Sequence, residues 1–437
     1  MKTGCALLLP ILLACGEARA LDPTSFETIL HTISASPSDI LRVNRAGQIA
    51  TLYRETGDSA DHLFFYGSGL STDIATTGTR FVQMSFSNWG ASLLDFDGPG
   101  AGLARAPLGQ APQEFFRTPS NGTATTPAIN DSGQIAFFAR DTNNHGLQDA
   151  YSVQPDQPPQ LLPDLHENQI FDLPLIDGQG RIMALHEFTP SFTQNWYRIA
   201  PGQAWENLTG GKLPANVKQL VLSSSNNGRS TSLSGNFTFE GLRTVAGKQR
   251  PEVFLWDDAT QSVKSILDLS SQQLDGLGNP YSLFGLTSFS DDNALWLSAV
   301  RYAGGTEFKY LYRKSDGTTV NIAAQLPAGF SVYPDNYMHT LAYNGDLWLA
   351  AKNDATNQFR YFLLHDDKLL PVLGDTSELL FMPVLTNDRE LFVWRTNPAG
   401  GADLVRMQIV VPEPGTIVLC STIVLVIAVA RLRRRFQ

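Results

Sequence analysis

The side chains best suited to bind a metal ion lie in residues 141–149, the run DTNNHGLQD. Asp141, Asn143 and Asp149 stand at its first, third and ninth positions, with glycine at the sixth, a spacing typical of calcium loops. However, a histidine takes the fifth position, where an oxygen ligand belongs, and Ser152 stands where a bidentate glutamate is needed. We therefore prefer a solvated turn and predict no cofactor, with a calcium site as the alternative.

Other catalytic patterns are not found in the sequence. The run 290–296 (SDDNALW) has part of a sialidase-type Asp box, but its aromatic residue comes one position early and the glycine is missing. The seven histidines show no zinc-ligand spacing, and no nucleophile turn of the Gly-x-Ser-x-Gly type or phosphate-binding Walker loop occurs. We predict no catalytic residues from sequence, although loops of a ring-shaped fold can assemble a site from distant positions.

Five tryptophans recur at similar places in the chain: Trp196, Trp256, Trp296, Trp348 and Trp394. All fall on segments that we expect to be strands. Their rings could stack on sugars, but large aromatics at repeated positions more often fill a core. We predict that they pack between neighbouring sheets.

A repeat supplies the elements that would position these side chains. Its clearest copy is residues 128–139 (AINDSGQIAFFA), which predicts a strand end, a tight Asn-Asp-Ser-Gly turn and a second strand. Glycine suits the last turn position because it accepts a positive φ. A third strand is expected at 149–153 and a fourth at 160–162.

Eight copies of this unit are found, and several are divergent. The last residue of the turn lies at positions 47, 90, 133, 180, 228, 293, 345 and 389, so the steps are 43, 43, 47, 48, 65, 52 and 44 residues. The fifth copy centres on Asn226-Asn227-Gly228. Four short strands in each step of this size are typical of β-propeller blades.

The Asn-Asp-x-Gly-x-apolar core of the unit resembles the extracellular repeats with an Ile-Asn-x-x-Gly pattern in exported bacterial β-propellers. The resemblance implies an all-β fold, a β-propeller of eight four-stranded blades, with seven or nine as alternatives. The eighth unit offers three strands (382–385, 390–395 and 404–409), and residues 26–33 could supply its fourth strand and close the ring.

The composition between the two ends limits the partners. The three cysteines are Cys5, Cys15 and Cys420, so residues 21–410 contain none and cannot be held by disulfides. Six of the 32 basic and two of the 42 acidic residues lie in the ends, which leaves 26 basic and 40 acidic residues between them, a net charge of −14. Such a domain repels phosphate backbones, so we predict no nucleic-acid partner.

The first twenty residues are predicted to be a signal peptide. Lys2 gives a positive start, residues 6–14 are apolar, and Ala18-Arg19-Ala20 is a cleavage site that makes Ala20 the last residue removed. The alternative is a lipobox at residues 12–16, in which Cys15 would carry a lipid. The apolar run is too short to span a membrane.

The C-terminal residues 411–437 combine three features. Val411, Pro412, Glu413 and Pro414 precede an uncharged apolar run, 417–430, and an arginine-rich end. By the positive-inside rule this predicts a short transmembrane helix with a cytoplasmic stop. The arrangement resembles the PEP-CTERM sorting signal, which implies recognition by an exosortase-type transpeptidase and display on the bacterial cell surface or in the extracellular matrix.

Taken together, the sequence predicts three segments: a signal peptide (1–20), a propeller domain (21–410) and a sorting signal (411–437). We expect a non-enzymatic surface module that binds or scaffolds exopolysaccharide or other matrix components. The alternative is a surface polysaccharide hydrolase or lyase whose carboxylates converge from several loops.

Overall fold

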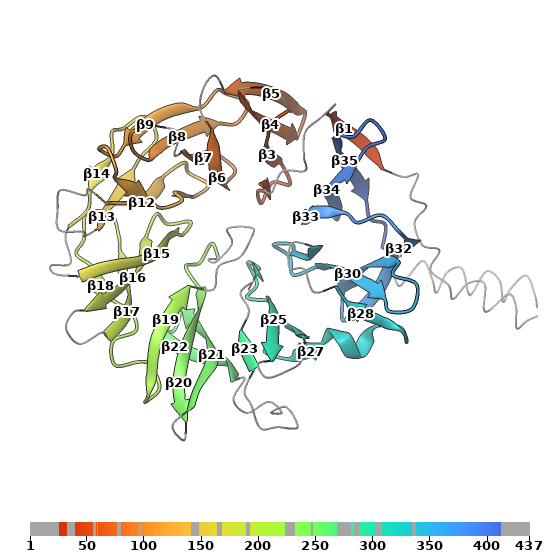
Figure 1. Ribbon diagram of the computed structural model, residues 1–437. Coiled ribbons are helices and arrows are strands. Elements are labelled where there is room, and N and C mark those ends of the chain that lie inside the picture. The colour runs from red at the N-terminus through yellow and green to blue at the C-terminus, as the bar shows by residue number, and fades with distance from the viewer. Residues whose placement is uncertain are drawn as a thin grey trace, which may run out of the picture.

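A computed structural model of the chain describes residues 26–32, 40–55, 58, 60–76, 80–95, 98–140, 148–163, 168–188, 193–222, 232–245, 248–268, 281–283, 288–301, 308–333 and 338–411. Apart from the short 3-10 helix η2 (Ile322–Gln325), the elements of this part of the chain are strands. They form eight antiparallel sheets arranged around a centre (Figure 1). The fold is therefore all-β and a β-propeller, as the repeat predicts.

Within sheets 1 to 7 the strands follow one another in chain order, and in sheet 8 the first strand of the chain joins the last three. Sheet 1 contains β2 (Leu41–Val43), β3 (Ile49–Tyr53), β4 (Asp61–Gly67) and β5 (Leu70–Thr76). Sheet 2 contains β6 (Phe81–Phe86), β7 (Gly90–Asp95), β8 (Gly102–Pro107) and β9 (Gln113–Arg117). Sheet 3 contains β10 (Thr123–Ala124) and β11 (Ala128–Ile129), which both pair with β12 (Ile135–Arg140), followed by β13 (Gln148–Val153) and β14 (Gln160–Leu161). Sheet 4 contains β15 (Asn168–Ile176), β16 (Ile182–Phe188), β17 (Thr193–Ile199) and β18 (Glu206–Asn207).

The second half repeats the arrangement. Sheet 5 contains β19 (Val217–Leu222), β20 (Phe237–Val245), β21 (Lys248–Asp257) and β22 (Ser262–Asp268). Sheet 6 contains β23 (Tyr281–Leu283), β24 (Ser288–Phe289), β25 (Leu295–Arg301), β26 (Phe308–Arg313) and β27 (Thr319–Asn321). Sheet 7 contains β28 (Phe330–Val332), β29 (Thr340–Leu341), β30 (Leu347–Asn353), β31 (Phe359–His365) and β32 (Lys368–Thr376). Sheet 8 contains β33 (Phe381–Leu385), β34 (Glu390–Thr396), β35 (Ala402–Gln408) and β1 (Glu27–His31).

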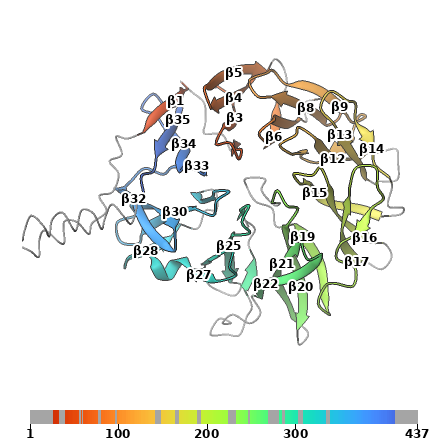
Figure 2. The ribbon, with the colours of Figure 1, turned by 180° about the vertical axis from the view of Figure 1, so that it is seen from behind.

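The N-terminal strand β1 completes the last sheet. It pairs antiparallel with β35, and the two strands lie side by side in both views (Figures 1 and 2). Beyond the strand, the hydroxyl of Thr32 donates to the carbonyl of Ala402 at 2.6 Å and accepts from its N–H at 3.1 Å. Sheet 8 in turn contacts sheet 1 through β33 and β2. The ends of the domain are therefore joined, as expected from residues 26–33.

The turn that leads into β3 in sheet 1 has an equivalent with similar geometry in most sheets, and in sheet 3 it leads into β12. In sheet 1 the N–H of Asn44 donates to the carbonyl of Gln48 at 2.9 Å, and Gly47 has a φ of 77°. Gly133 has a φ of 82° at the equivalent position, where an added Cβ would also lie 2.6 Å from the ring of Trp89. We call the side of the ring that carries these turns the turn face.

The sequence-based prediction placed the turn of the fifth repeat at the wrong residues. Residues 226–228 lie outside the described residues, and the equivalent turn of sheet 5 is Ser232–Asn236. There the N–H of Ser232 donates to the carbonyl of Asn236 at 2.9 Å, and Gly235 has a φ of 87°. The Asn-Asn-Gly run has strong turn chemistry, but the serine hydroxyl also satisfies this turn, because it accepts from the N–H of Asn236 at 3.1 Å.

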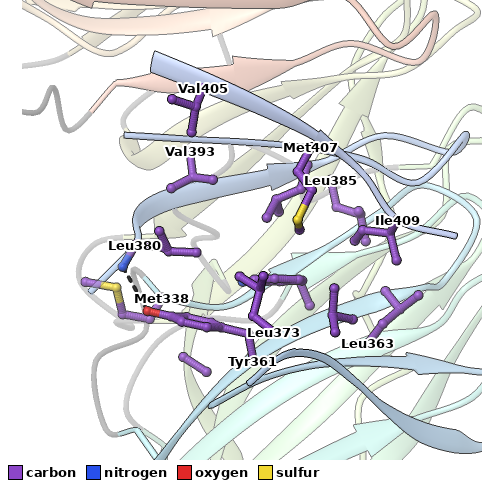
Figure 3. Packing of buried hydrophobic residues seen from close by; sticks show 14 of the residues in the cluster. Met338, Tyr361, Leu363, Leu373, Leu380, Leu385, Val393, Val405, Met407 and Ile409 are labelled. Atoms are coloured by element: carbon purple, nitrogen blue, oxygen red, sulfur yellow. Dashed lines mark hydrogen bonds between the residues drawn. The ribbon is translucent and has the colours of Figure 1, made fainter. Parts of the chain in front are cut away.

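The hydrophobic core lies between neighbouring sheets. Between sheets 7 and 8, Tyr361 packs with Leu380, Val393 and Ile409, and its hydroxyl accepts from the N–H of Leu380 at 2.8 Å (Figure 3). The tryptophans belong to this core: the side chains of Trp196, Trp256, Trp348 and Trp394 are 0% exposed. The core interpretation is confirmed for these four, and the side chain of Trp296 lies outside the described part.

Candidate functional site

The second residue of each turn on the turn face forms a set that we call the axial residues. By turn position they are Arg45, Asn88, Asp131, Gly178, Leu233, Asp291, Tyr343 and Asn387. Each of these turns leads into one of the strands β3, β7, β12, β16, β20, β25, β30 and β34, and in Figure 1 β3 lies nearer the centre of the ring than β5 does. Arg45 contacts Asp131 and Asp291 from a different sheet, so these three turns lie close together.

Arg45 connects three of these sheets. From sheet 1, its Nε and Nη2 donate to the two carboxylate oxygens of Asp291 in sheet 6, at 2.8 and 2.9 Å. Its Nη1 donates to Asp131 in sheet 3 at 3.3 Å. Neither sheet 3 nor sheet 6 is a ring neighbour of sheet 1, so the guanidinium must lie near the ring axis.

The neighbouring axial residues hold this cluster in place. The guanidinium of Arg45 lies over the ring of Tyr343, 4.7 Å from its centroid. The second oxygen of Asp131 accepts from the backbone N–H of Asn88 at 3.0 Å, and the backbone N–H of Asp291 donates to the carbonyl of Tyr343 at 3.0 Å. Arg45 is thus positioned by a bidentate carboxylate and an aromatic face, the contacts that guanidinium makes best.

The charge of this cluster is unbalanced. Burial works to lower the pKa of Arg45, but the hydrogen bond to Asp291 and the charge of both carboxylates raise it above its ordinary value, so the guanidinium stays charged. One positive and two negative groups leave a net charge of −1. The side chains of Arg45, Asp131 and Asp291 are 22%, 25% and 29% exposed, so a ligand from solvent can reach them. The arrangement suits a cationic group.

A second ionic cluster on the turn face joins sheets 7 and 8. The buried carboxylate of Asp346 accepts from Nδ1 of His365 at 2.6 Å and from Nε of Arg389 at 3.2 Å. Nη2 of Arg389 then donates to Nε2 of His365 at 2.9 Å. A general base needs the Nε2 lone pair, which Arg389 already occupies. This cluster therefore acts as a clamp between sheets.

The residues predicted to bind calcium are not assembled into a site by the described structure. Asp141 and Asn143 lie outside the described residues, and Asp149 is on β13, paired with Ala139 of β12. Among the described residues no group of three His, Cys, Asp or Glu side chains could hold a metal ion. The run 290–296 contains the turn of sheet 6, as we interpreted it, because the N–H of Ser290 donates to the carbonyl of Ala294 at 3.0 Å.

The segments at the two ends are only partly described. Ala20, Pro412, Glu413 and Pro414 lie outside the described residues, and Val411 is partly buried against the core of sheets 7 and 8. Within the ranges that are described, no helix has the length and apolar character needed to cross a membrane.

The axial cluster was missed by the sequence analysis, although a signal for it exists. Asp131 and Asp291 both lie in turns of the repeat, and Arg45 occupies the same turn position in the first copy. Aligning all copies of the repeat and comparing the second residue of each turn would have identified the axial residues as a set. That comparison needs the ring, because Arg45 and Asp291 are 246 residues apart.

Comparisons with known proteins find similar solved structures only at low identity. No family model matches the chain, and no curated protein matches it. Among solved structures it is similar to the β-propeller domain of the Trilobed protease from Pyrococcus furiosus, at 9% identity over 78% of this chain and 98% of that one, with a TM-score of 0.44. It is also similar to prolyl endopeptidases (12% identity, 83% of this chain and 55% of that chain, TM-score 0.48) and an acylaminoacyl peptidase (10%, 83% and 58%, 0.44).

The TM-scores of these likenesses are all below 0.5, and the chain spans little more than half the length of the last two. They nevertheless correct the sequence-based prediction of function. We expected a non-enzymatic module that binds or scaffolds exopolysaccharide, but the resembling propellers named above belong to peptidases. The prediction was wrong because it depended on the sorting signal and on the absence of catalytic motifs. Neither of these gives information about the function of the propeller domain itself.

Proposed function

We propose that this chain is an exported β-propeller that takes part in peptide processing, with the axial residues as its peptide-binding site. The observation that carries the proposal is the cluster of Arg45, Asp131 and Asp291 at the ring axis. It offers peptides a partly exposed site with excess negative charge and an aromatic wall. Peptides regularly present matching groups, namely an N-terminal ammonium and the side chains of lysine and arginine.

The propeller is proposed to be one closed ring of eight blades within residues 21–410. Eight sheets among the described residues and contacts from each sheet to the next support this count. The pairing of β1 with β35 supports closure by the N-terminal strand. A crystal structure with seven or nine blades would contradict the proposed count.

The two ends are proposed to deliver the ring to the cell surface. Residues 1–20 would be removed after Ala20, and residues 411–437 would act as a PEP-CTERM sorting signal with a transmembrane helix over 417–430. An exosortase-type transpeptidase is the proposed partner for that signal. Intact-mass measurement of surface-extracted protein tests both cuts, and a mature form that keeps the terminal arginines would contradict processing of the tail.

The strength expected of the axial site follows from its charges. Arg45 neutralises one of the two carboxylates, and a peptide cation can pair with the other. A hydrogen bond to a charged group contributes roughly 1.5–3 kcal/mol. Its loss should therefore weaken peptide binding about 10- to 100-fold.

The test is a titration with a fluorescent peptide that has a free N-terminus and one lysine. Its matched partner is acetylated and carries norleucine in place of lysine. Fluorescence anisotropy should show tighter binding of the cationic peptide to the wild type. Asp131→Asn keeps the shape of the side chain and removes its charge, so it should weaken binding about 10-fold or more.

The control variant is Asp388→Asn, which removes an exposed acid of the same face in the turn of sheet 8. It should bind like the wild type. Mass spectrometry of the peptide after incubation measures turnover in the same samples. The proposal fails if the wild type does not prefer the cationic peptide, or if the two variants weaken binding equally.

A further inference from the structure

The chain leaves the ring on the turn face. The last residue of β35, Gln408, pairs with Glu390, the first residue of β34 after the turn of sheet 8. The next N–H, that of Ile409, donates to the carbonyl of Arg389 in that turn at 2.9 Å, and the Gln408 side chain donates to the carbonyl of Asp388 at 2.8 Å. The C-terminal segment therefore starts from the same side as the axial residues.

The exit point is held by packing. Ile409 is 4% exposed and lies in the core between sheets 7 and 8, near Leu363 and Leu385 (Figure 3). Val411 packs against the same core, whereas Val410 between them is 69% exposed. The chain is thus fixed to the turn face up to residue 411.

The distance from this point to the apolar run is short. Five residues, 412–416, separate Val411 from Ile417. The Cα atoms of Val411 and Ile417 are therefore at most about 22 Å apart when the chain is fully extended. The ring is about as thick as its seven-residue strands are long, roughly 24 Å. To bring the opposite face onto a membrane, the linker would have to cross that thickness and also pass around the outer strand β1. It is too short for both.

We infer that, before the tail is processed, the turn face lies toward the lipid bilayer into which residues 417–430 insert. This inference rests on the proposed function, because it takes the tail to be a membrane segment. The opposite face, with the loop at residues 397–401, then points away from the cell. The axial residues face the envelope, so a peptide reaches them from the cell side of the ring.

Energy transfer to labelled lipids tests this orientation. The protein is residues 21–437 with Cys420→Ser, reconstituted in liposomes of neutral lipid that contain an acceptor-labelled lipid. One cysteine carries the donor dye, introduced either by Asp388→Cys on the turn face or by Ala399→Cys on the opposite face. Both positions are exposed and belong to sheet 8, so a tilt of the ring affects them similarly. The same proteins in detergent without acceptor lipid give the baseline.

We expect transfer at least twofold more efficient from position 388 than from position 399. Equal transfer, or more from position 399, overturns the orientation while leaving the tail as an anchor. Transfer from neither position overturns the tail as an anchor and the orientation with it. The peptide-binding result is independent of both outcomes, since it does not need the tail.

Discussion

Lowering the pH should destabilise the propeller through one buried imidazole, that of His339 in sheet 7. Its Nδ1 accepts from the backbone N–H of Ala350 at 3.3 Å, so Nε2 must carry the proton, and it donates to the carbonyl of Tyr333 at 2.8 Å. A proton on Nδ1 would point at the N–H of Ala350 and break that bond. The native state therefore excludes the charged form.

The size of the effect follows from the pKa. Burial lowers the pKa of His339 to about 4 from its ordinary 6.5. As the pH falls below 6.5 the unfolded chain binds a proton that the native chain refuses, so stability is lost until the pH reaches the native pKa. Between about pH 7.5 and about pH 4.5 this single group should reduce the free energy of unfolding by about 2–3 kcal/mol.

Urea unfolding followed by the fluorescence of the buried tryptophans measures this loss across the pH range. His339→Asn is the matched variant, because its side-chain oxygen can still accept from Ala350 but does not titrate. The wild type should lose about 2–3 kcal/mol more than the variant between the two pH values, whatever the stability of each at neutral pH. Parallel curves for the two proteins would refute the reasoning.

Two further predictions concern other parts of the ring. Gly133→Ala should lower the free energy of unfolding by about 2–5 kcal/mol, because it adds a clash with the ring of Trp89 to the strain of a left-handed residue. Gly400 has a φ of 91° and open space around it, so Gly400→Ala should lower the free energy of unfolding by only about 1–2 kcal/mol in the same assay. The pKa of His62 is shifted in the opposite direction from that of His339. Although burial works to lower this pKa, the carboxylates of Asp58 and Asp73 raise it above 6.5. The stabilisation from charged His62 is therefore complete below pH 6.5 and is lost as the pH rises through the native pKa. The difference in free energy of unfolding between the wild type and His62→Asn should shrink between about pH 5.5 and about pH 9. A constant difference would contradict this prediction.

The features that sequence predicts here are those set by local chemistry. The turn at Asn130–Gly133 and the strands on either side of it follow from residues that are neighbours in the chain, and β11 and β12 lie where the repeat places them. The strands of sheet 8 also agree within two residues, since short runs rich in apolar residues mark them. The position of the fifth turn was predicted wrongly because two nearby segments, 226–228 and 232–236, both have residues that favour turns. Local sequence does not distinguish them, and only packing decides which one forms the turn of sheet 5.

The axial site depends on contacts that no local pattern contains. Arg45 meets Asp131 across 86 residues and Asp291 across 246, and only the closed ring brings their turns to one axis. Within its own copy each residue is an ordinary polar turn residue. The charge imbalance appears only when the copies are superposed, and the divergence of the repeat hides that alignment.

The pairing of the first strand with the last has a consequence for the order in which the protein is built. Glu27 and Arg406, which form an ion pair across β1 and β35, are 379 residues apart. A chain that crosses a membrane N-terminus first releases β1 at the beginning, and β1 must wait there until nearly the whole domain has followed. Contacts this distant in sequence form slowly, and an unpaired strand edge recruits other chains. Secretion stalled before residue 402 would therefore leave β1 without its partner strand, ready to join the sheet of another molecule.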